Sequence, residues 1–253
     1  MFNLAPVPVP DLSGRVVLVT GAGKGIGAEL VRILVANGAM VYAGVFPGEA
    51  AEDLPAAATV LRLDVTKQAD VDAALAQVRA ESGRLDVLVN NAGMISPIGP
   101  LAEIATDALA PAFAVNVMGV HRMALAALPL LRAARGVIVN AGTGAATTPM
   151  EGWTVYCSTK AAMRMLTQMM AMELAPDVKS YFVGIPPTDT AMQGAIRSAG
   201  FNPISKIPQE KLVRPAVPAS VLAWMCGAEA RAVDEVLLDV RQEIFTKMMD
   251  LPA

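Results

Sequence analysis

Tyr156 and Lys160 are the residues whose types and spacing most directly suggest chemistry. They lie four positions apart in a segment predicted to be helical, so both side chains project from one helix face. A nearby ammonium favours the phenolate form and lowers the pKa of a tyrosine from its ordinary value near ~10. The pair therefore indicates a tyrosine that donates or accepts a proton near neutral pH.

A glycine-rich loop near the N-terminus is a candidate phosphate-binding site. It follows a valine-rich apolar run and opens a predicted helix. Glycines allow a tight turn and let the backbone approach a pyrophosphate, which the N-terminus of the helix then stabilises. The loop residues expected to contact a dinucleotide are Thr20, Gly21, Gly23, Lys24, Gly25, Ile26 and Gly27.

The adenosine side of this expected site departs from the usual pattern at Val45. In many dinucleotide-binding folds an acid about twenty residues beyond the glycine loop binds a ribose hydroxyl. Here the second predicted strand ends in Val45, which offers no hydrogen bond. Lys24 lies within the loop, where its ammonium could reach a 2′-phosphate. We therefore expect NADP(H) as the cofactor, with NAD(H) as the alternative.

The elements that must position these residues alternate along the chain. Apolar runs predict strands at 15–20, 39–45, 59–63, 85–90, 136–141, 179–185 and 235–239. Helices are predicted near 25–37, 67–82, 106–131, 153–175 and 217–230. Apolar strands separated by helices indicate a parallel sheet covered on both faces, and right-handed crossovers then give a doubly wound α/β Rossmann fold of about seven strands.

One domain is expected over residues 14–253, preceded by an extended, proline-containing arm at 1–13. The segment 186–216 interrupts the alternation with several prolines. Such a segment is either a lid or binding loop, or a short surface helix with a loop.

The conjunction of motifs resembles the short-chain dehydrogenase/reductase family over about residues 11–192. The glycine loop, Asn90–Gly93, Asn116 and the Tyr156–Lys160 pair occur in the order and spacing of that family. The resemblance implies that Tyr156 donates a proton to a carbonyl, that Lys160 holds the nicotinamide ribose, and that Asn116 positions a water. It also implies cofactor contacts from Asp64, Val65, Asn91, Ala92, Gly93, Pro186 and Thr190.

Three positions depart from the family pattern. Thr143 stands where the family usually has serine, and its hydroxyl offers the same donor and acceptor. We assign substrate orientation to Thr143, with Thr147 and Thr148 as fallback candidates. Pro187 replaces a glycine beside the nicotinamide, and the last strand continues as Leu238–Arg241 instead of Asp-Gly-Gly.

The expected pocket wall is apolar, and no arginine or lysine is obviously placed to hold an anionic substrate. Its candidate residues are Met94, Ile95, Met150, Trp153, Met192 and Phe201. These residues predict an oxidoreductase that transfers hydride between NADP(H) and a hydrophobic ketone or aldehyde, or the corresponding alcohol. The alternatives are a nucleotide sensor without turnover, and a lyase or isomerase that uses the same pair.

Composition excludes several other classes. The net charge of −3 argues against nucleic-acid binding, and no run of about twenty apolar residues predicts a membrane span. With one histidine and two cysteines, the chain is not expected to form a metal site. The N-terminus lacks the basic region typical of a signal peptide, so we expect a cytoplasmic location. Methionines crowd the helix of Tyr156 at 163, 165, 169, 170 and 172, more than a single helix buries against its own sheet. In the family that the sequence resembles, this helix and the preceding long one commonly form a subunit interface, so the resemblance implies a homodimer or homotetramer.

Overall fold

Seven parallel strands form the central sheet of the computed structural model, which describes residues 3–250. The strands are β1 (Val16–Thr20), β2 (Met40–Val45), β3 (Thr59–Arg62), β4 (Val87–Asn90), β5 (Val137–Thr143), β6 (Lys179–Ile185) and β7 (Leu237–Asp239). Their order across the sheet is β3-β2-β1-β4-β5-β6-β7, so the direction of winding reverses between β1 and β4. The predicted doubly wound parallel fold is confirmed.

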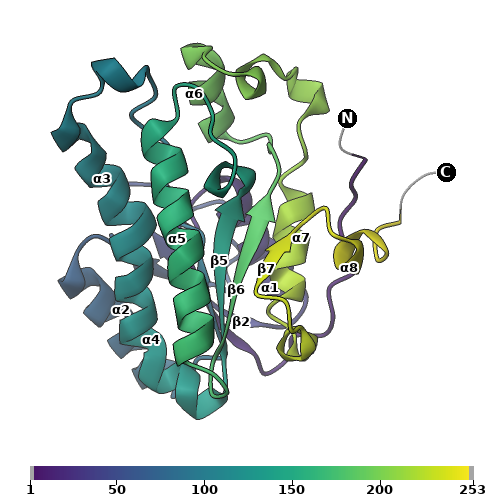
Figure 1. The fold of residues 1–253 in the computed structure, drawn as a ribbon. Coiled ribbons are helices and arrows are strands. Elements are labelled where there is room, and N and C mark those ends of the chain that lie inside the picture. The colour runs from purple at the N-terminus through teal and green to yellow at the C-terminus, as the bar shows by residue number, and fades with distance from the viewer. Residues whose placement is uncertain (1–2, 251–253) are drawn as a thin grey trace.

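Helices cover both faces of this sheet (Figure 1). One face carries α1 (Gly25–Ala36) and α7 (Ala216–Trp224), and the other carries α2 (Gln68–Ser82), α4 (Val120–Ala134) and α5 (Thr154–Glu173). Alternation along a strand supplies both cores, because successive side chains point to opposite faces. In β1, Val17 and Val19 join the core under α1, whereas Val16 and Leu18 join the core under α4.

A long helical stretch precedes β5 and consists of three parts. The short helix α3 (Ala110–Phe113) passes through a π-helical turn at Ala114–Gly119 into α4. By length and composition alone, the stretch Thr106–Ala134 is apolar enough to cross a membrane. Its buried side chains in α4, such as Met123 and Leu131, pack in the core below the sheet. This packing gives its apolar composition a structural role within the fold.

Two segments differ from the simplest sequence expectation. The helix predicted at 217–230 ends at Trp224, and a 3-10 turn at Ala228–Ala232 follows Gly227, a residue that weakens helices. The segment 186–216 contains the helix α6 (Ala191–Ala199), closed by Gly200 in the left-handed conformation, with shorter 3-10 turns after it. The segment therefore contains a helix with loops, and part of it lines the cleft described below; its role as a lid or binding loop stays a prediction. A last short helix, α8 (Glu243–Thr246), follows β7.

The N-terminal arm is extended and packs against the domain. The backbone N–H of Val7 donates to Ser220 Oγ of α7 at 2.9 Å, and the N–H of Leu12 donates to the carbonyl of Asn37 at 2.8 Å. Val7 and Leu12 are both buried in the core beneath α1 and α7. Contacts at both ends thus hold the described part of the arm, residues 3–12, on the surface formed by these two helices.

Candidate active site

A cleft of about 650 Å³ opens at the carboxyl edge of the sheet, where parallel strands deliver their following loops to one side. It brings together residues predicted from motifs that are far apart in the sequence. Those that line it are Gly21, Lys24, Gly25, Ile26, Asp64, Val65, Asn91, Ala92, Gly93, Thr143, Tyr156, Lys160, Pro186 and Thr190, with Met94, Met150, Trp153 and Met192 of the expected substrate pocket.

Tyr156 and Lys160 lie on one face of α5 and both are buried against the cleft. The Lys160 ammonium donates a hydrogen bond to the carbonyl of Ala141 at 2.9 Å, and it lies 5.8 Å from the centre of the Tyr156 ring. Trp153 packs edge-on against Tyr156 at 5.7 Å between ring centres. The tyrosine is therefore held by an aromatic contact on one side and by its own helix on the other.

Burial moves both titrating groups away from their charged forms. Burial raises the pKa of Tyr156 well above its ordinary value, the charge on Cys157 adds to this, and a hydrogen bond with Thr143 acts in the opposite direction. Burial also lowers the pKa of Lys160 to about 8. We expected Lys160 to lower the pKa of Tyr156, and it does not. Its ammonium is directed to the Ala141 carbonyl, and burial of the tyrosine has the larger effect on the tyrosine pKa.

Thr143 is the hydroxyl that meets the tyrosine. It ends β5, lines the cleft, and its side chain forms a hydrogen bond with Tyr156 while its Oγ1 accepts from the N–H of Ala145 at 3.3 Å. Of the two fallback candidates, Thr147 is exposed and donates to the Gly144 carbonyl, and Thr148 lines the cleft. This geometry favours Thr143 as the group that orients a substrate oxygen beside Tyr156.

Asn116 lies behind the cleft, in the π-helical turn before α4. Its Oδ1 accepts from the N–H of Met94 at 2.9 Å, and its Nδ2 donates to the carbonyl of Met94 at 2.8 Å and to Thr159 Oγ1 at 2.9 Å. Asn116 is fully buried and is not among the lining residues. It fixes the backbone of Met94 in place, and its role in positioning a water stays a prediction.

The glycine loop presents its backbone to the cleft at the start of α1. Gly25 has a φ of 55°, and within the described chain neither a side-chain cap nor an acidic residue occupies the first turn of the helix. The N–H groups of this turn and the positive end of the helix dipole are thus available to an anion. Since the cleft runs from this turn to Tyr156, the residues fit a dinucleotide with its pyrophosphate at α1.

Three predicted contacts of this loop lie beneath the cleft instead of lining it, namely Thr20, Gly23 and Gly27. Thr20 Oγ1 accepts from the N–H groups of Asn91 and Ala92 at 3.1 and 3.0 Å, which ties the loop to the turn after β4. A Cβ on Gly27 would lie 2.2 Å from the carbonyl oxygen of Gly21, so only glycine fits this close approach. These residues shape the loop through packing and backbone contacts.

Asn90 and Asn91 connect neighbouring strands of the sheet through their side-chain amides. Asn90 Nδ2 donates to Asn140 Oδ1 across the β4–β5 pair at 2.9 Å. Asn91 Nδ2 donates to the carbonyls of Thr20 and Gly21 at 3.1 and 3.0 Å. The turn after β4 is therefore fixed to both neighbouring strands before it reaches the cleft.

At the adenosine end, the structure supplies an acid that the sequence pattern did not indicate. Val45 is fully buried and does not line the cleft. Glu49, four residues later, lines it and pairs with the ammonium of Lys24, on which the expectation of NADP(H) rested. Asp64 and Val65 lie on the same wall, as expected. Glu49 was missed because it lies in an irregular loop whose course no periodicity predicts.

The substrate end is mainly apolar but not wholly so. Met94, Met150, Trp153 and Met192 line it, and Phe201 does not: its ring packs against Gly152, within 3 Å of where a Cβ on that glycine would lie. Lining residues that sequence analysis missed include Gln193, Ile196 and Ile204 from the α6 region and Arg241 after β7. Ile95 is buried in the small core beside Trp153 and Tyr156.

Arg241 corrects the expectation that no cation is placed near the substrate. It lines the cleft, and its guanidinium pairs with both carboxylate oxygens of Asp239 at 2.6 and 2.7 Å. The departure from Asp-Gly-Gly after β7 therefore adds a charged pair to the wall of the site. The sequence showed that Leu238–Arg241 replaces Asp-Gly-Gly. It did not show where Arg241 lies, because the position of the loop after β7 depends on the register of that strand with β6.

Neither a metal centre nor a second nucleophile is evident in the part of the chain that the structure describes. No group of three or more His, Cys, Asp and Glu side chains in residues 3–250 could hold a metal ion. His121 is exposed on α4, away from the cleft. Cys157 is half-buried beside Thr148, and burial raises the pKa of its thiol. Their positions agree with a surface histidine and a packing cysteine.

Comparison with known proteins gives the family. A model described as short chain dehydrogenase matches residues 15–200. L-fucose dehydrogenase of Oryctolagus cuniculus is 36% identical over 164 residues, 64% of this chain but only 58% of that protein, which is less than two thirds of its length. Benzil reductase ((S)-benzoin forming) of Saccharomyces cerevisiae is 32% identical over 237 residues, 84% of this chain and 90% of that protein.

A solved structure agrees with the fold. The 3-ketoacyl-(acyl-carrier-protein) reductase of Brucella melitensis, solved in complex with NADH, superimposes with a TM-score of 0.79 at 28% identity, covering 90% of this chain and 97% of that one. The family model covers most of the chain, and these relatives carry the names of dehydrogenases and reductases. The protein is therefore an oxidoreductase that belongs to the short-chain dehydrogenase/reductase family.

Proposed function

We propose that the protein reduces a hydrophobic ketone or aldehyde with a nicotinamide dinucleotide, and oxidises the corresponding alcohol in reverse. The observation that supports this most strongly is the buried Tyr156 hydroxyl with Thr143 beside it, between the glycine loop and an apolar pocket. A carbonyl oxygen placed against these two hydroxyls lies where a proton donor is needed. The Tyr156 hydroxyl is protonated at neutral pH, so its proton is available in the reductive direction.

Each residue of the site then has a defined role. The reduced nicotinamide supplies hydride to the carbonyl carbon when it is bound. Thr143 orients the carbonyl oxygen by a hydrogen bond, and Tyr156 donates its phenolic proton to that oxygen. Lys160, whose ammonium lies in the cleft and donates to the Ala141 carbonyl, holds a ribose hydroxyl of the dinucleotide. Asn116 acts indirectly, through the backbone of Met94.

The lining of the pocket supports an apolar substrate over a polyhydroxylated one. Met94, Met150, Trp153 and Met192 contribute little hydrogen bonding, and Gln193 uses its amide nitrogen to donate to the carbonyl of Ile204 at 3.0 Å. A sugar buries many hydroxyl groups, each of which needs a partner. An aromatic or aliphatic ketone, as in the name of the benzil reductase relative, needs only the contacts that Thr143 and Tyr156 provide at its oxygen.

The test is consumption of NADH and NADPH, followed by absorbance, against a panel of aromatic and aliphatic ketones, aldehydes and ketoses. We expect turnover with aromatic or branched ketones to exceed that with ketoses. Reduction of ketoses alone would contradict the substrate class. Tight nucleotide binding with no turnover on any carbonyl would favour a sensor, or a lyase or isomerase, over a reductase.

We further propose that the protein assembles as a homodimer or homotetramer through the α4–α5 face, which we define by Met118, Leu125, Met165, Met169 and Met172. Within α5, Met163 and Met170 are buried in the core, whereas Met172 is 67% exposed; Leu125 of α4 is 62% exposed. The long helix that ends in α4 runs beside α5 in Figure 1. Exposed apolar side chains on two adjacent helices are typical of an association surface.

Light scattering after size exclusion tests this assembly. Leu125→Glu and Met172→Glu should each shift the protein toward monomer, because each places a charge in an apolar interface. Leu101→Glu is the matched control, since Leu101 is 70% exposed in a 3-10 turn outside this face. A monomeric wild-type protein at micromolar concentration would overturn the proposal.

A further inference from the structure

Resting on the proposed function, we infer that Glu49 is the residue that selects the dinucleotide: its carboxylate binds the adenosine ribose and excludes a 2′-phosphate, so this protein prefers NAD(H) to NADP(H). The inference reverses the expectation drawn from Lys24. It depends on where the loop after β2 places its side chains, and on the charges that then face the adenosine end of the cleft.

The position of Glu49 is the first support. In related folds an acid at the end of the second strand contacts the ribose, but here Val45 is fully buried under the glycine loop. Glu49, in the loop that follows β2, supplies a carboxylate in its place. Its Oε2 lies 3.1 Å from where a Cβ on Gly23 would be, so the carboxylate sits directly over the glycine loop and lines the cleft.

The backbone that carries Glu49 is fixed, which is the second support. The N–H of Glu49 donates to the carbonyl of Phe46 at 3.0 Å, and its own carbonyl accepts from the Arg62 guanidinium at 2.7 Å. Arg62 is the last residue of β3, so the loop is tied to the sheet. A carboxylate held in this way is ready to accept hydrogen bonds without first ordering a mobile segment.

The charges at this end of the cleft are the third support. The Lys24 ammonium is already engaged by the Glu49 carboxylate, so a 2′-phosphate would reach it only by displacing that carboxylate. Asp64 also lines the cleft, and hydrogen bonds from the N–H and Oγ1 of Thr66 at 2.9 and 2.7 Å stabilise its carboxylate. A 2′-phosphate would bring about two further negative charges toward these carboxylates. A ribose hydroxyl is neutral and donates to a carboxylate, forming a charge-assisted hydrogen bond.

Binding measurements test the inference without requiring turnover. Dissociation constants for NADH and NADPH are measured by fluorescence titration, using Trp153 in the cleft as a reporter. The wild type should bind NADH about tenfold more tightly than NADPH, the factor given by one hydrogen bond to a charged group. Glu49→Gln should weaken NADH binding, strengthen NADPH binding, and change the ratio of the two constants by at least about tenfold.

Two further variants separate the explanations. Glu52→Gln is the matched control, because Glu52 is an exposed acid of the same loop that does not line the cleft; it should leave the ratio unchanged. Lys24→Met should keep the preference for NADH. If Lys24 instead held a 2′-phosphate, this change would raise the NADPH constant far more than the NADH constant.

The outcomes are distinct. A wild type that prefers NADPH, or a ratio that Glu49→Gln does not change, would overturn the assignment of Glu49 while leaving the reductase proposal intact. Failure to bind either dinucleotide would overturn the proposed function itself.

Discussion

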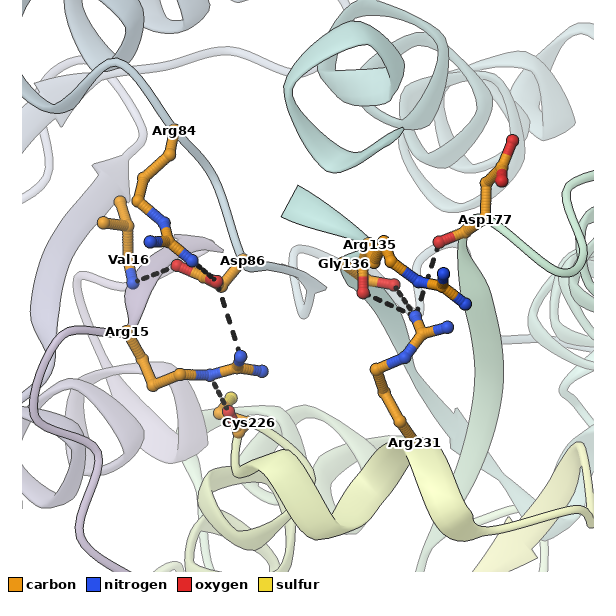
Figure 2. Close-up of polar contacts among 9 residues, drawn as sticks. All are labelled: Arg15, Val16, Arg84, Asp86, Arg135, Gly136, Asp177, Cys226 and Arg231. Atoms are coloured by element: carbon orange, nitrogen blue, oxygen red, sulfur yellow. Dashed lines mark hydrogen bonds and ion pairs between the residues drawn. The ribbon is translucent and has the colours of Figure 1, made fainter. Parts of the chain in front are cut away.

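At the edge of the sheet where the strands begin, the buried carboxylate of Asp86 is paired with two arginines; at the edge where they end, the buried ammonium of Lys160 meets no carboxylate among residues 3–250. Figure 2 shows the first edge. Asp86 is fully buried and accepts from the N–H of Val16 at 2.9 Å, from Arg84 at 2.6 Å and from Arg15 at 3.4 Å. Arg15 also donates to the carbonyl of Cys226 at 3.0 Å, which joins the start of β1 to the end of α7.

A second arginine acts similarly at the same edge. Arg231 donates to the carbonyls of Arg135, Gly136, Pro176 and Asp177, which lie just before β5 and β6. Figure 2 shows the contacts with Arg135, Gly136 and Asp177. Main-chain carbonyls left at the ends of helices thereby gain a charged donor. Every partner in this network belongs to the protein, so the network serves the fold.

The carboxyl edge contrasts with this arrangement. Lys160 is as buried as many core residues, yet in residues 3–250 its ammonium contacts the carbonyl of Ala141 and the sulfur of Met163 and no carboxylate. A buried cation without a counter-ion lowers the stability of the fold. The same desolvation lowers the pKa of Lys160, because it disfavours the charged form. The difference is that the cleft contains a buried cation without a carboxylate partner among residues 3–250, whereas Asp86 at the opposite edge is paired with Arg15 and Arg84.

The largest expected effect is on catalysis. Tyr156→Phe should lower turnover about 10³-fold, because general acid catalysis typically contributes about 10²- to 10⁴-fold, and should leave dinucleotide binding nearly intact. The matched control is Tyr181→Phe. Tyr181 is also buried, but its hydroxyl donates to the carbonyls of Ala230 and Val233, away from the cleft. This control should lose about 1 kcal/mol of stability and no turnover; equal turnover in both variants would contradict the roles assigned.

The next effect is on stability and comes from the opposite edge. Asp86→Ala should lower the free energy of unfolding by about 3 kcal/mol. The substitution removes the carboxylate that accepts hydrogen bonds from the Arg15 guanidinium and from the backbone N–H of Val16. Urea denaturation measures this, with Asp53→Ala as an exposed control. Activity per folded molecule should be unchanged in both. If Asp86→Ala lost turnover but kept its stability, Asp86 would influence the cleft, and the contrast between the two edges would be wrong.

The smallest effect is the pH dependence of stability due to Lys160. Its folded pKa of about 8 lies below its unfolded pKa of 10.5, so between these values the unfolded chain binds the extra proton. Stability should therefore rise with pH from about 8 toward 10 in the wild type, relative to Lys160→Met, by about 2 kcal/mol. Urea midpoints for both proteins at pH 7 and 9.5 measure the difference. Parallel curves would show that Lys160 is not a destabilised cation.

Local patterns were sufficient to predict much of the molecule. The seven strands, the glycine turn at Gly25 and the side-by-side placement of Tyr156 and Lys160 depend on residues that are neighbours in the sequence, or on the periodicity of one element. The carboxyl-edge position of the site follows from the parallel sheet itself. For these features, the backbone has few conformations to choose from, so residue types and spacing determine them.

The tertiary structure alone decided what each charge faces. Lys24 pairs with Glu49, Arg241 pairs with Asp239 on the cleft wall, and Phe201 packs on Gly152 instead of entering the pocket. These contacts join irregular loops whose course is fixed by the sheet register and by helix packing far away in the sequence. A side chain's electrostatic partner depends on distances of a few ångströms in space, which spacing along the chain does not record.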